Sequence, residues 1–210
     1  MIKSLNFACF AVALTTLPLS GCVSSILPDP APADIVYRLS TQTASVAANA
    51  DAAVMRVDRP AVSKALRGED IVISPDGRRL AVAEQARWAE ALPDLIQDSM
   101  LDVLSARADL VGVLPTSGAR TEYRVHLTVR SFESNFDNGQ GSAPLATVHY
   151  AVTFSNSSTR ALLGTYDVRK TQRASSFSVP AIVEAQDSAN LEALTEVADW
   201  ISDVLSKTRS

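Results

Sequence analysis

Apolar and polar residues alternate most strictly in the stretch EYRVHLTVRSF, which begins at Glu122. Its apolar face would hold Tyr123, Val125, Leu127 and Val129. Its polar face would hold Arg124, His126, Thr128 and Arg130. Successive side chains of a strand point to opposite faces of a sheet, so this pattern predicts a half-buried β-strand.

A second strand with the same alternation is predicted in LATVHYAVTF. Its apolar face would hold Ala146, Val148, Tyr150, Val152 and Phe154. We expect the two strands to pair antiparallel with their apolar faces together, for example with Val125 opposite Val152. The stretch RALLGTYDVRK predicts a third strand after the short turn SNSST.

Shorter strands are predicted in the first half of the chain. DIVYRLS and AAVMRVDRP are rich in Val, Ile and Tyr, and Pro60 ends the second because proline cannot donate a ladder hydrogen bond. DIVISPDGRRLAVAE predicts a hairpin, since two apolar runs flank the turn residues Pro75-Asp76-Gly77. DLVGVLP predicts a short buried strand that Pro115 closes.

Two amphipathic helices complete the predicted elements. The first lies between Glu84 and Arg107, and Pro93 fits its first turn or kinks a longer helix. One face of it would hold Trp88, Leu92, Leu95, Ile96, Met100, Val103 and Leu104. The second runs toward the C-terminus from a cap near Asp187 or Ser188. Its apolar stripe would hold Leu191, Leu194, Ala198, Ile201 and Leu205. We therefore predict an α/β or α+β fold, with a mixed sheet that is largely antiparallel in its C-terminal half and two helices packed on it.

The N-terminal segment has the pattern of an export signal. Lys3 is its one charged residue, and thirteen uncharged residues run from Phe7 to Leu19. This run is too short for a transmembrane helix and has the length of a signal-peptide core. It leads into Leu19-Ser20-Gly21-Cys22, which resembles the lipobox of bacterial lipoproteins, where the signal is cut before an acylated cysteine. We predict a signal peptide at residues 1–21 and lipidation at Cys22. The alternative is a buried cysteine in a core helix.

The second cysteine of the chain, Cys9, lies inside the predicted signal, so the mature protein would keep no free thiol. No disulfide, cysteine-based metal site or thiol catalysis is then expected. We expect no cofactor apart from the covalent diacylglycerol and acyl chain on Cys22. The three acyl chains of this modification exceed what stable membrane anchoring requires.

A proline-rich segment separates the predicted anchor from the domain. Pro28, Pro30 and Pro32 favour an extended tether over residues 22–34, although a merely flexible leader is the simpler alternative. Residues 35–210 would form one globular domain, in keeping with 47% hydrophobic and 20% charged residues. A net charge of −4 gives no general attraction to nucleic acid, so none is expected as a partner.

Candidate catalytic chemistry is sparse. The chain contains no GxSxG, HExxH or GxxxxGK motif. Its two histidines, His126 and His149, fall on the same predicted polar sheet face. They could join a metal or acid–base site, but solvated histidines are the simpler interpretation. We predict no catalytic, cofactor-binding or metal-binding residue.

Two further polar groups have equally simple interpretations. Arg124 and Arg130 could contribute to a docking surface on the polar sheet face, or they are merely solvated. Asp94, Asp98 and Asp102 follow one another at helical spacing. This spacing could suggest a cation site, but a solvated helix face is the simpler explanation.

Taken in order, these features resemble the ABC-type transport auxiliary lipoproteins, whose familiar members accompany Pqi-type MCE (mammalian cell entry) lipid-transport systems. The resemblance rests on the lipobox, YRL at Tyr37–Leu39, VDRP at Val57–Pro60, the segment from Gly77 that includes Trp88, and the terminal VEAQDSANLEALTEVADWISDVL. It spans nearly all of the mature chain and brings no catalytic residue with it.

The resemblance implies a three-layer, anticodon-binding-domain-like arrangement of a mixed sheet and helices. It also implies a non-enzymatic, periplasm-facing lipoprotein that helps ABC-transporter and MCE-domain partners to move lipid or another apolar substrate between membranes. Outer-membrane anchoring is expected, because Val23 stands where an Asp would resemble an inner-membrane retention signal. The chain could also form a homo-oligomer. The alternative function is a stand-alone periplasmic ligand-binding or enzymatic lipoprotein.

Overall fold

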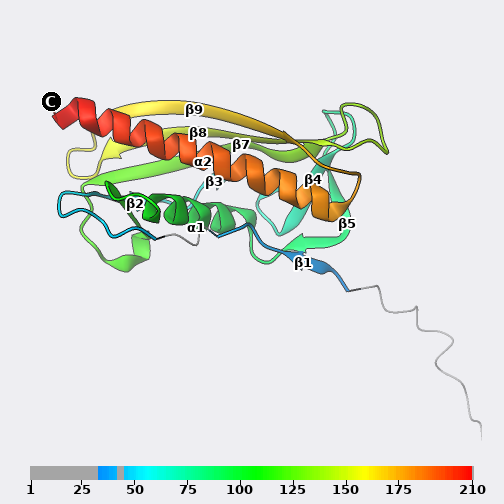
Figure 1. The fold of residues 1–210 in the computed structure, drawn as a ribbon, viewed down its shortest axis with the longest axis horizontal. Helices are drawn as coiled ribbons and strands as arrows, with labels where there is room; N and C mark the ends of the chain where they lie inside the picture. Colours follow the sequence, from blue (N-terminus) through cyan, green and yellow to red (C-terminus); the bar gives the residue numbers. More distant parts are fainter. Residues whose placement is uncertain (1–32, 42–44, 210) are drawn as a thin grey trace, which may run out of the picture. The chain divides into compact units, whose positions relative to one another are not determined.

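The computed structural model describes residues 33–41 and 45–209, which form a mixed sheet and two α-helices (Figure 1). The strands are β1 (Ile35–Tyr37), β2 (Ala53–Val57), β3 (Ala61–Val62), β4 (Asp70–Ser74), β5 (Ala81–Trp88), β6 (Leu110–Val113), β7 (Tyr123–Asn135), β8 (Leu145–Asn156) and β9 (Leu162–Arg173). The helices are α1 (Leu92–Ser105) and α2 (Val179–Arg209). Short 3-10 turns lie at Lys64–Leu66 and Pro115–Ser117.

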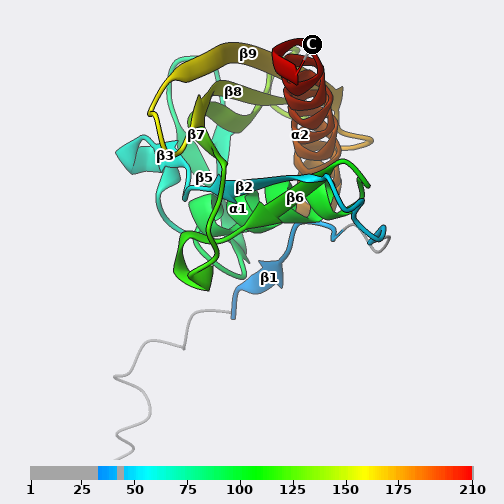
Figure 2. The same cartoon turned by 90° about the vertical axis from the view of Figure 1, so that its left-hand side faces the viewer.

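Strand β7 is the central strand of the sheet. One edge of β7 pairs antiparallel with β8 over its whole length. The other edge pairs in parallel with three short strands in succession, β2, β3 and β4. The sheet continues through β9 beyond β8, through β6 beyond β2, and through β5 and β1 beyond β4. Figure 2 shows that the sheet curls around α2.

Both helices pack on the same face of this sheet and contact each other (Figure 1). Helix α1 approaches β6 so closely that a Cβ on Gly112 would lie 2.7 Å from Leu104 Cδ1. Helix α2 lies over β8 and β9, where the Trp200 ring meets the Phe154 ring edge-on at 6.2 Å. The mixed sheet with two helices packed on it confirms the predicted fold class. The opposite sheet face carries polar residues such as Arg124 of β7.

Buried aromatic and aliphatic residues fill the space between sheet and helices. The largest fully buried side chains are Trp88, Tyr150, Phe132, Phe154, Met55, Ile71, Leu92, Ile96, Met100, Leu104, Leu110 and Leu127. Trp88 is the last residue of β5, so its predicted place on the helix is wrong. It lies beside Tyr37 of β1 in the sheet, and α1 begins only at Leu92, with Pro93 in its first turn as predicted. The core role of Trp88 holds, because it is 0% exposed and packs edge-on against Phe132 at 6.2 Å.

One strand register and one helix boundary also differ from the prediction. The β7–β8 pairing sets Val125 opposite Phe154, a slip of two residues from the expected partner Val152. An even slip keeps every apolar side chain on the same face, so the core is unaffected. Helix α2 begins at Val179 rather than near Asp187. The additional turns at the N-terminal end of α2 pack through small residues, since Ala181 and Ala185 are buried in a cluster with Ala146 of β8.

Buried polar side chains tie the helices to particular strands. Tyr150 of β8 donates a hydrogen bond from its hydroxyl to Asn190 Oδ1 of α2 at 2.7 Å. Gln186 of α2 donates to the Val72 carbonyl of β4 at 3.1 Å. Since an unpaired buried polar group is costly, these bonds favour one placement of α2 over the sheet.

Candidate functional site

The predicted lipidation site, Cys22, lies outside the described residues. The signal peptide at residues 1–21 and nearly all of the tether at residues 22–34 lie outside them too. Lipidation and tethering therefore stay predictions. In the described domain, polar side chains from separate elements meet on the outer face of the sheet and beside α1.

The polar face of the sheet brings two arginines side by side. Arg56 of β2 lies directly opposite Arg124 of β7, and Arg124 lies opposite Ser155 of β8. The β-strand alternation that buries Met55 and Val125 sends these arginines to the outer face. Like charges directly opposite each other in a sheet repel, so this pair requires a counter-charge.

Asp58 supplies that counter-charge. Its side chain is only 13% exposed, and its Oδ1 lies 3.1 Å from Arg56 Nε. Arg124 Nε donates a hydrogen bond to the other carboxylate oxygen, Oδ2. The backbone N–H of Asp58 donates to the Val125 carbonyl at 3.0 Å, which fixes the position of the residue. One carboxylate thus holds two guanidinium groups, and the cluster keeps a net positive charge.

Both arginines line a hollow of about 440 Å³ on the outer face. We call it the arginine hollow. Its lining residues are Arg56, Arg124, Ser155, Asn156, Ser157 and Arg160. A second hollow of about 220 Å³ shares Arg124 and Ser155 and adds His126 and Thr153. No acidic side chain lines either hollow among the described residues.

Arg160 enters the arginine hollow from the tight turn between β8 and β9. Asn156 Oδ1 accepts hydrogen bonds from the backbone N–H groups of Ser158 and Thr159, each at 3.0 Å. The Asn156 N–H donates to the Ala161 carbonyl at 2.9 Å and closes the turn. Arg160 adopts a left-handed backbone with φ of 59°. In the part of the chain that the structure describes, no carboxylate forms an ion pair with Arg160.

The two histidines lie on the predicted polar face but belong to different places. His126 lies opposite Thr153, and its Nδ1 is 3.7 Å from Asp58 Oδ2. His149 lies four residues from Thr153 on β8, a distance of about 13 Å at 3.3 Å per residue. Its Nε2 lies 2.8 Å from Oδ1 of Asp167, a residue on the exposed outer face of β9. The structure does not bring the histidines together in one site.

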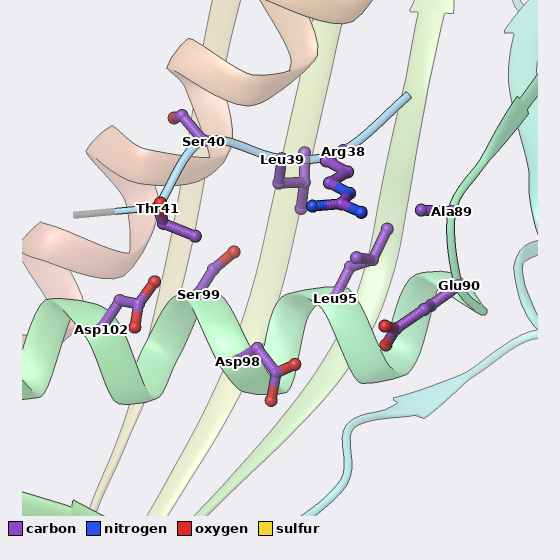
Figure 3. A pocket seen from close by; sticks show the side chains of 10 residues that line it. All are labelled: Arg38, Leu39, Ser40, Thr41, Ala89, Glu90, Leu95, Asp98, Ser99 and Asp102. Atoms are coloured by element: carbon purple, nitrogen blue, oxygen red, sulfur yellow. The ribbon is translucent and has the colours of Figure 1, made fainter. Parts of the chain in front are cut away.

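An acidic hollow of about 250 Å³ lies between residues 38–41 and α1 (Figure 3). Its lining residues are Arg38, Leu39, Ser40, Thr41, Ala89, Glu90, Leu95, Asp98, Ser99 and Asp102. Leu95 and Ser99 rise from α1 toward the 38–41 segment. The pKa of Asp98 is raised, mainly by partial burial and further by the charges of Glu90 and Asp102.

The third aspartate of the helical series, Asp94, does not line this hollow. Both of its carboxylate oxygens accept hydrogen bonds from Arg59, one of them at 2.9 Å from Nη2. The hydrogen bond from Arg59 lowers the pKa of Asp94. The predicted aspartate series is thus split between an ion pair and a hollow. Within residues 33–41 and 45–209, no three His, Cys, Asp or Glu side chains gather closely enough to hold a metal ion.

Comparison with known proteins decides the family. A family model described as "ABC-type transport auxiliary lipoprotein component" matches residues 37–198. The chain belongs to this family. The matched range of this auxiliary lipoprotein runs from the end of β1 to Ala198 in α2 and includes both hollows on the polar face. No curated protein matches the chain at a significant level.

Solved structures show the same fold. Protein XCC0632 from Xanthomonas campestris, of the DUF330 family, superposes with a TM-score of 0.71 at 19% identity, covering 83% of this chain and 99% of that one. An uncharacterised protein superposes with a TM-score of 0.65 at 13% identity, covering 81% of this chain and 99% of the other. Among the described residues, no helix has the length and apolarity needed to span a membrane.

The VDRP stretch, quoted above as a family feature, has a structural role that the sequence analysis did not assign. Asp58 pairs with both neighbouring arginines of the polar face and offsets part of their charge, while Arg59 binds Asp94 at the start of α1. Arg56 and Arg160 were not predicted as site residues. The Arg-x-Asp spacing was an available signal for Arg56, because it sets both side chains on one face of a strand.

Proposed function

We propose that this auxiliary lipoprotein is anchored through Cys22 in the outer membrane, faces the periplasm, and assists an ABC transport system of the MCE type. In this role it helps to move lipid or another apolar substrate between membranes and performs no chemical step itself. The match of the family model to residues 37–198 carries the proposal. The lipobox that ends at Cys22 supports the anchor, and Val23 supports the choice of membrane.

The proposed partners are the ABC-transporter and MCE-domain components of that system. The described domain offers a broad surface for such partners, since both helices cover one face of the sheet and leave the other lined by polar side chains. Aromatic and arginine residues dominate binding energy in protein interfaces, so arginines on this face are suitable anchors. A homo-oligomer would be compatible with the same surface.

Capture of partners from the envelope tests the proposal. The full-length, lipidated protein carrying a C-terminal tag is cross-linked in cells, purified from solubilised membranes and examined by mass spectrometry. We expect inner-membrane ABC-transporter and MCE-domain components to be enriched over an unrelated tagged lipoprotein. Absence of these components, together with a co-purified apolar ligand, would instead support the stand-alone binding lipoprotein.

A further inference from the structure

We propose that the arginine hollow binds a phosphate group, either free or as the ester of a larger molecule. This inference goes beyond the transport role and does not depend on it. It starts from the origin of the three arginines: Arg56 comes from β2, Arg124 from β7, and Arg160 from the β8–β9 turn. Residues so far apart in sequence converge on one hollow only through the fold.

The charge of the hollow favours an anion. Three arginines line the hollow, and among the described residues Asp58 is the one carboxylate that pairs with any of them, which leaves two positive charges at the site. The whole chain has a net charge of −4, so this concentration of positive charge is local. Guanidinium groups present paired donors whose geometry matches phosphate oxygens, and they hold phosphate more specifically than a point charge does.

Two buried donors in the hollow have no hydrogen-bond partner. They are Arg56 Nε and Ser157 Oγ, as judged within the described part of the chain. Buried polar groups are almost always satisfied in native proteins, and each exception requires an explanation. A phosphate oxygen in the hollow would accept from Ser157 and compete favourably for Arg56, which lies 3.1 Å from Asp58 without a well-aligned hydrogen bond.

Two of the three arginines, Arg56 and Arg124, are paired with Asp58 before any ligand arrives. Asp58 fixes Arg56 and Arg124 from below, and the Asn156-centred turn holds the backbone of Arg160. Ligand binding would therefore order few additional side chains, which lowers its entropic cost. Arg160 has no ion pair to give up, so its full charge is available to the ligand.

The lining of the hollow defines which part of a ligand it takes. A volume of about 440 Å³ lies within the range of small-molecule sites. All of its lining residues are Arg, Ser or Asn. No apolar side chain lines it among the described residues, so the lining favours a phosphate with polar substituents over an acyl chain. The hollow thus suits a phospholipid headgroup or a soluble phosphate ester, and both share the phosphate.

Isothermal titration calorimetry on the full-length, lipidated chain in a non-ionic detergent tests the proposal. The probes are inorganic phosphate, glycerol 3-phosphate, and dihexanoylphosphatidylglycerol below its micelle concentration, with dihexanoylglycerol as the phosphate-free control. Arg160→Gln is the main variant, because it breaks no ion pair of the fold. Arg130→Gln is its matched control, since Arg130 lies on β7 but does not line the hollow.

We expect at least one phosphate probe to bind the parent chain and dihexanoylglycerol not to bind. Arg160→Gln should raise the Kd of that probe about tenfold or more, as expected for losing a charge-assisted hydrogen bond, while Arg130→Gln changes it less than twofold. Binding of the phosphatidylglycerol alone would identify a lipid headgroup, and binding of glycerol 3-phosphate as tightly would identify a soluble ester. Absence of all phosphate binding, or equal effects of the two variants, would overturn the proposal.

Discussion

At the residue scale, Trp88 is the largest of the fully buried side chains and makes a prediction about stability. It is fully buried at the end of β5 and meets Phe132 edge-on. Trp88→Ala would leave a cavity in the core and should lower the free energy of unfolding by about 3–5 kcal/mol. Denaturant unfolding followed by circular dichroism measures the loss. Trp88→Phe, which keeps most of the packing, should lose clearly less; an unchanged midpoint for the alanine variant would contradict the burial.

Asp98 makes a prediction about pH. Its folded-state pKa is raised above the ordinary value of 3.8, so the ionised carboxylate destabilises the fold at neutral pH. This penalty disappears as the pH falls through the raised pKa, because the folded state then holds the proton. Asp98→Asn should therefore raise Tm at pH 7, and the gain should vanish as the pH falls below about 4, where both states become protonated.

The neighbouring Asp94 gives the control of opposite sign. Its pKa is lowered by the hydrogen bond from Arg59, so its carboxylate stabilises the fold at pH values above the unfolded pKa. Asp94→Asn should lower Tm at pH 7, and this loss should also fade as the pH falls. Equal signs for the two variants at pH 7 would show that their surroundings differ from those described.

At the element scale, the placement of α2 over β8 depends on a buried hydrogen bond. Tyr150→Phe removes the hydroxyl that donates to Asn190, whose side chain is 1% exposed. The unpaired amide oxygen should cost about 1–3 kcal/mol of unfolding free energy. Tyr166→Phe is the matched control, because its hydroxyl bonds Glu196, a partly exposed residue at the surface. A loss in the control as large as that for Tyr150→Phe would refute the role of burial.

Elements with strong local periodicity were predictable from the sequence, and those set by distant partners were not. Strands β7 and β8 follow from strict alternation, and the β4–β5 hairpin follows from its turn residues. Trp88 was misassigned because its spacing to Leu92 and Leu95 happens to fit a helix across the β5–α1 boundary. Register and pairing of β7 with β2, β3 and β4 are tertiary effects that no local pattern contains.

The candidate site also combines features that are local in the sequence with features that depend on distant partners. The polar face of β7 could be read from its sequence, so Arg124 and His126 were placed there correctly. The ion pair of Arg124 with Asp58 joins residues 66 positions apart, and only the fold reveals it. Arg160 lies in a turn without periodicity, so its approach to Arg56 could not be anticipated.

At the scale of the whole molecule, anchoring depends on Cys22. Cys22→Ser should abolish metabolic labelling by a palmitate analogue, because a hydroxyl cannot replace the thiol that carries the lipid. The protein should then accumulate as an uncleaved precursor or leave the membrane fraction. Cys9→Ser is the matched control and should be labelled and processed normally. Normal labelling of the Cys22 variant would refute the lipoprotein assignment.

The proposal that the molecule performs no chemical step can be tested through its histidines. His126 and His149 are the side chains whose ordinary pKa lies near neutrality, as a general acid or base requires. The double variant His126→Ala, His149→Ala should complement a deletion strain under membrane stress, with protein abundance checked by immunoblot. Loss of complementation at normal abundance and with normal partner capture would favour the enzymatic alternative.

The pairing of β7 also determines when the sheet can form during synthesis of the chain. A chain is synthesised from its N-terminus, so β2, β3 and β4 leave the ribosome well before residues 123–135, the strand on which all three align. For roughly a third of its synthesis, from the end of β2 at Val57 to the arrival of β7, the chain holds strands that lack their central partner. Such long-range pairing folds slowly, typically in milliseconds to seconds, and leaves strand edges open in the meantime. Until β7 is synthesised, the chain is therefore incompletely folded, which is the state that an export pathway for unfolded chains or a holding chaperone can bind.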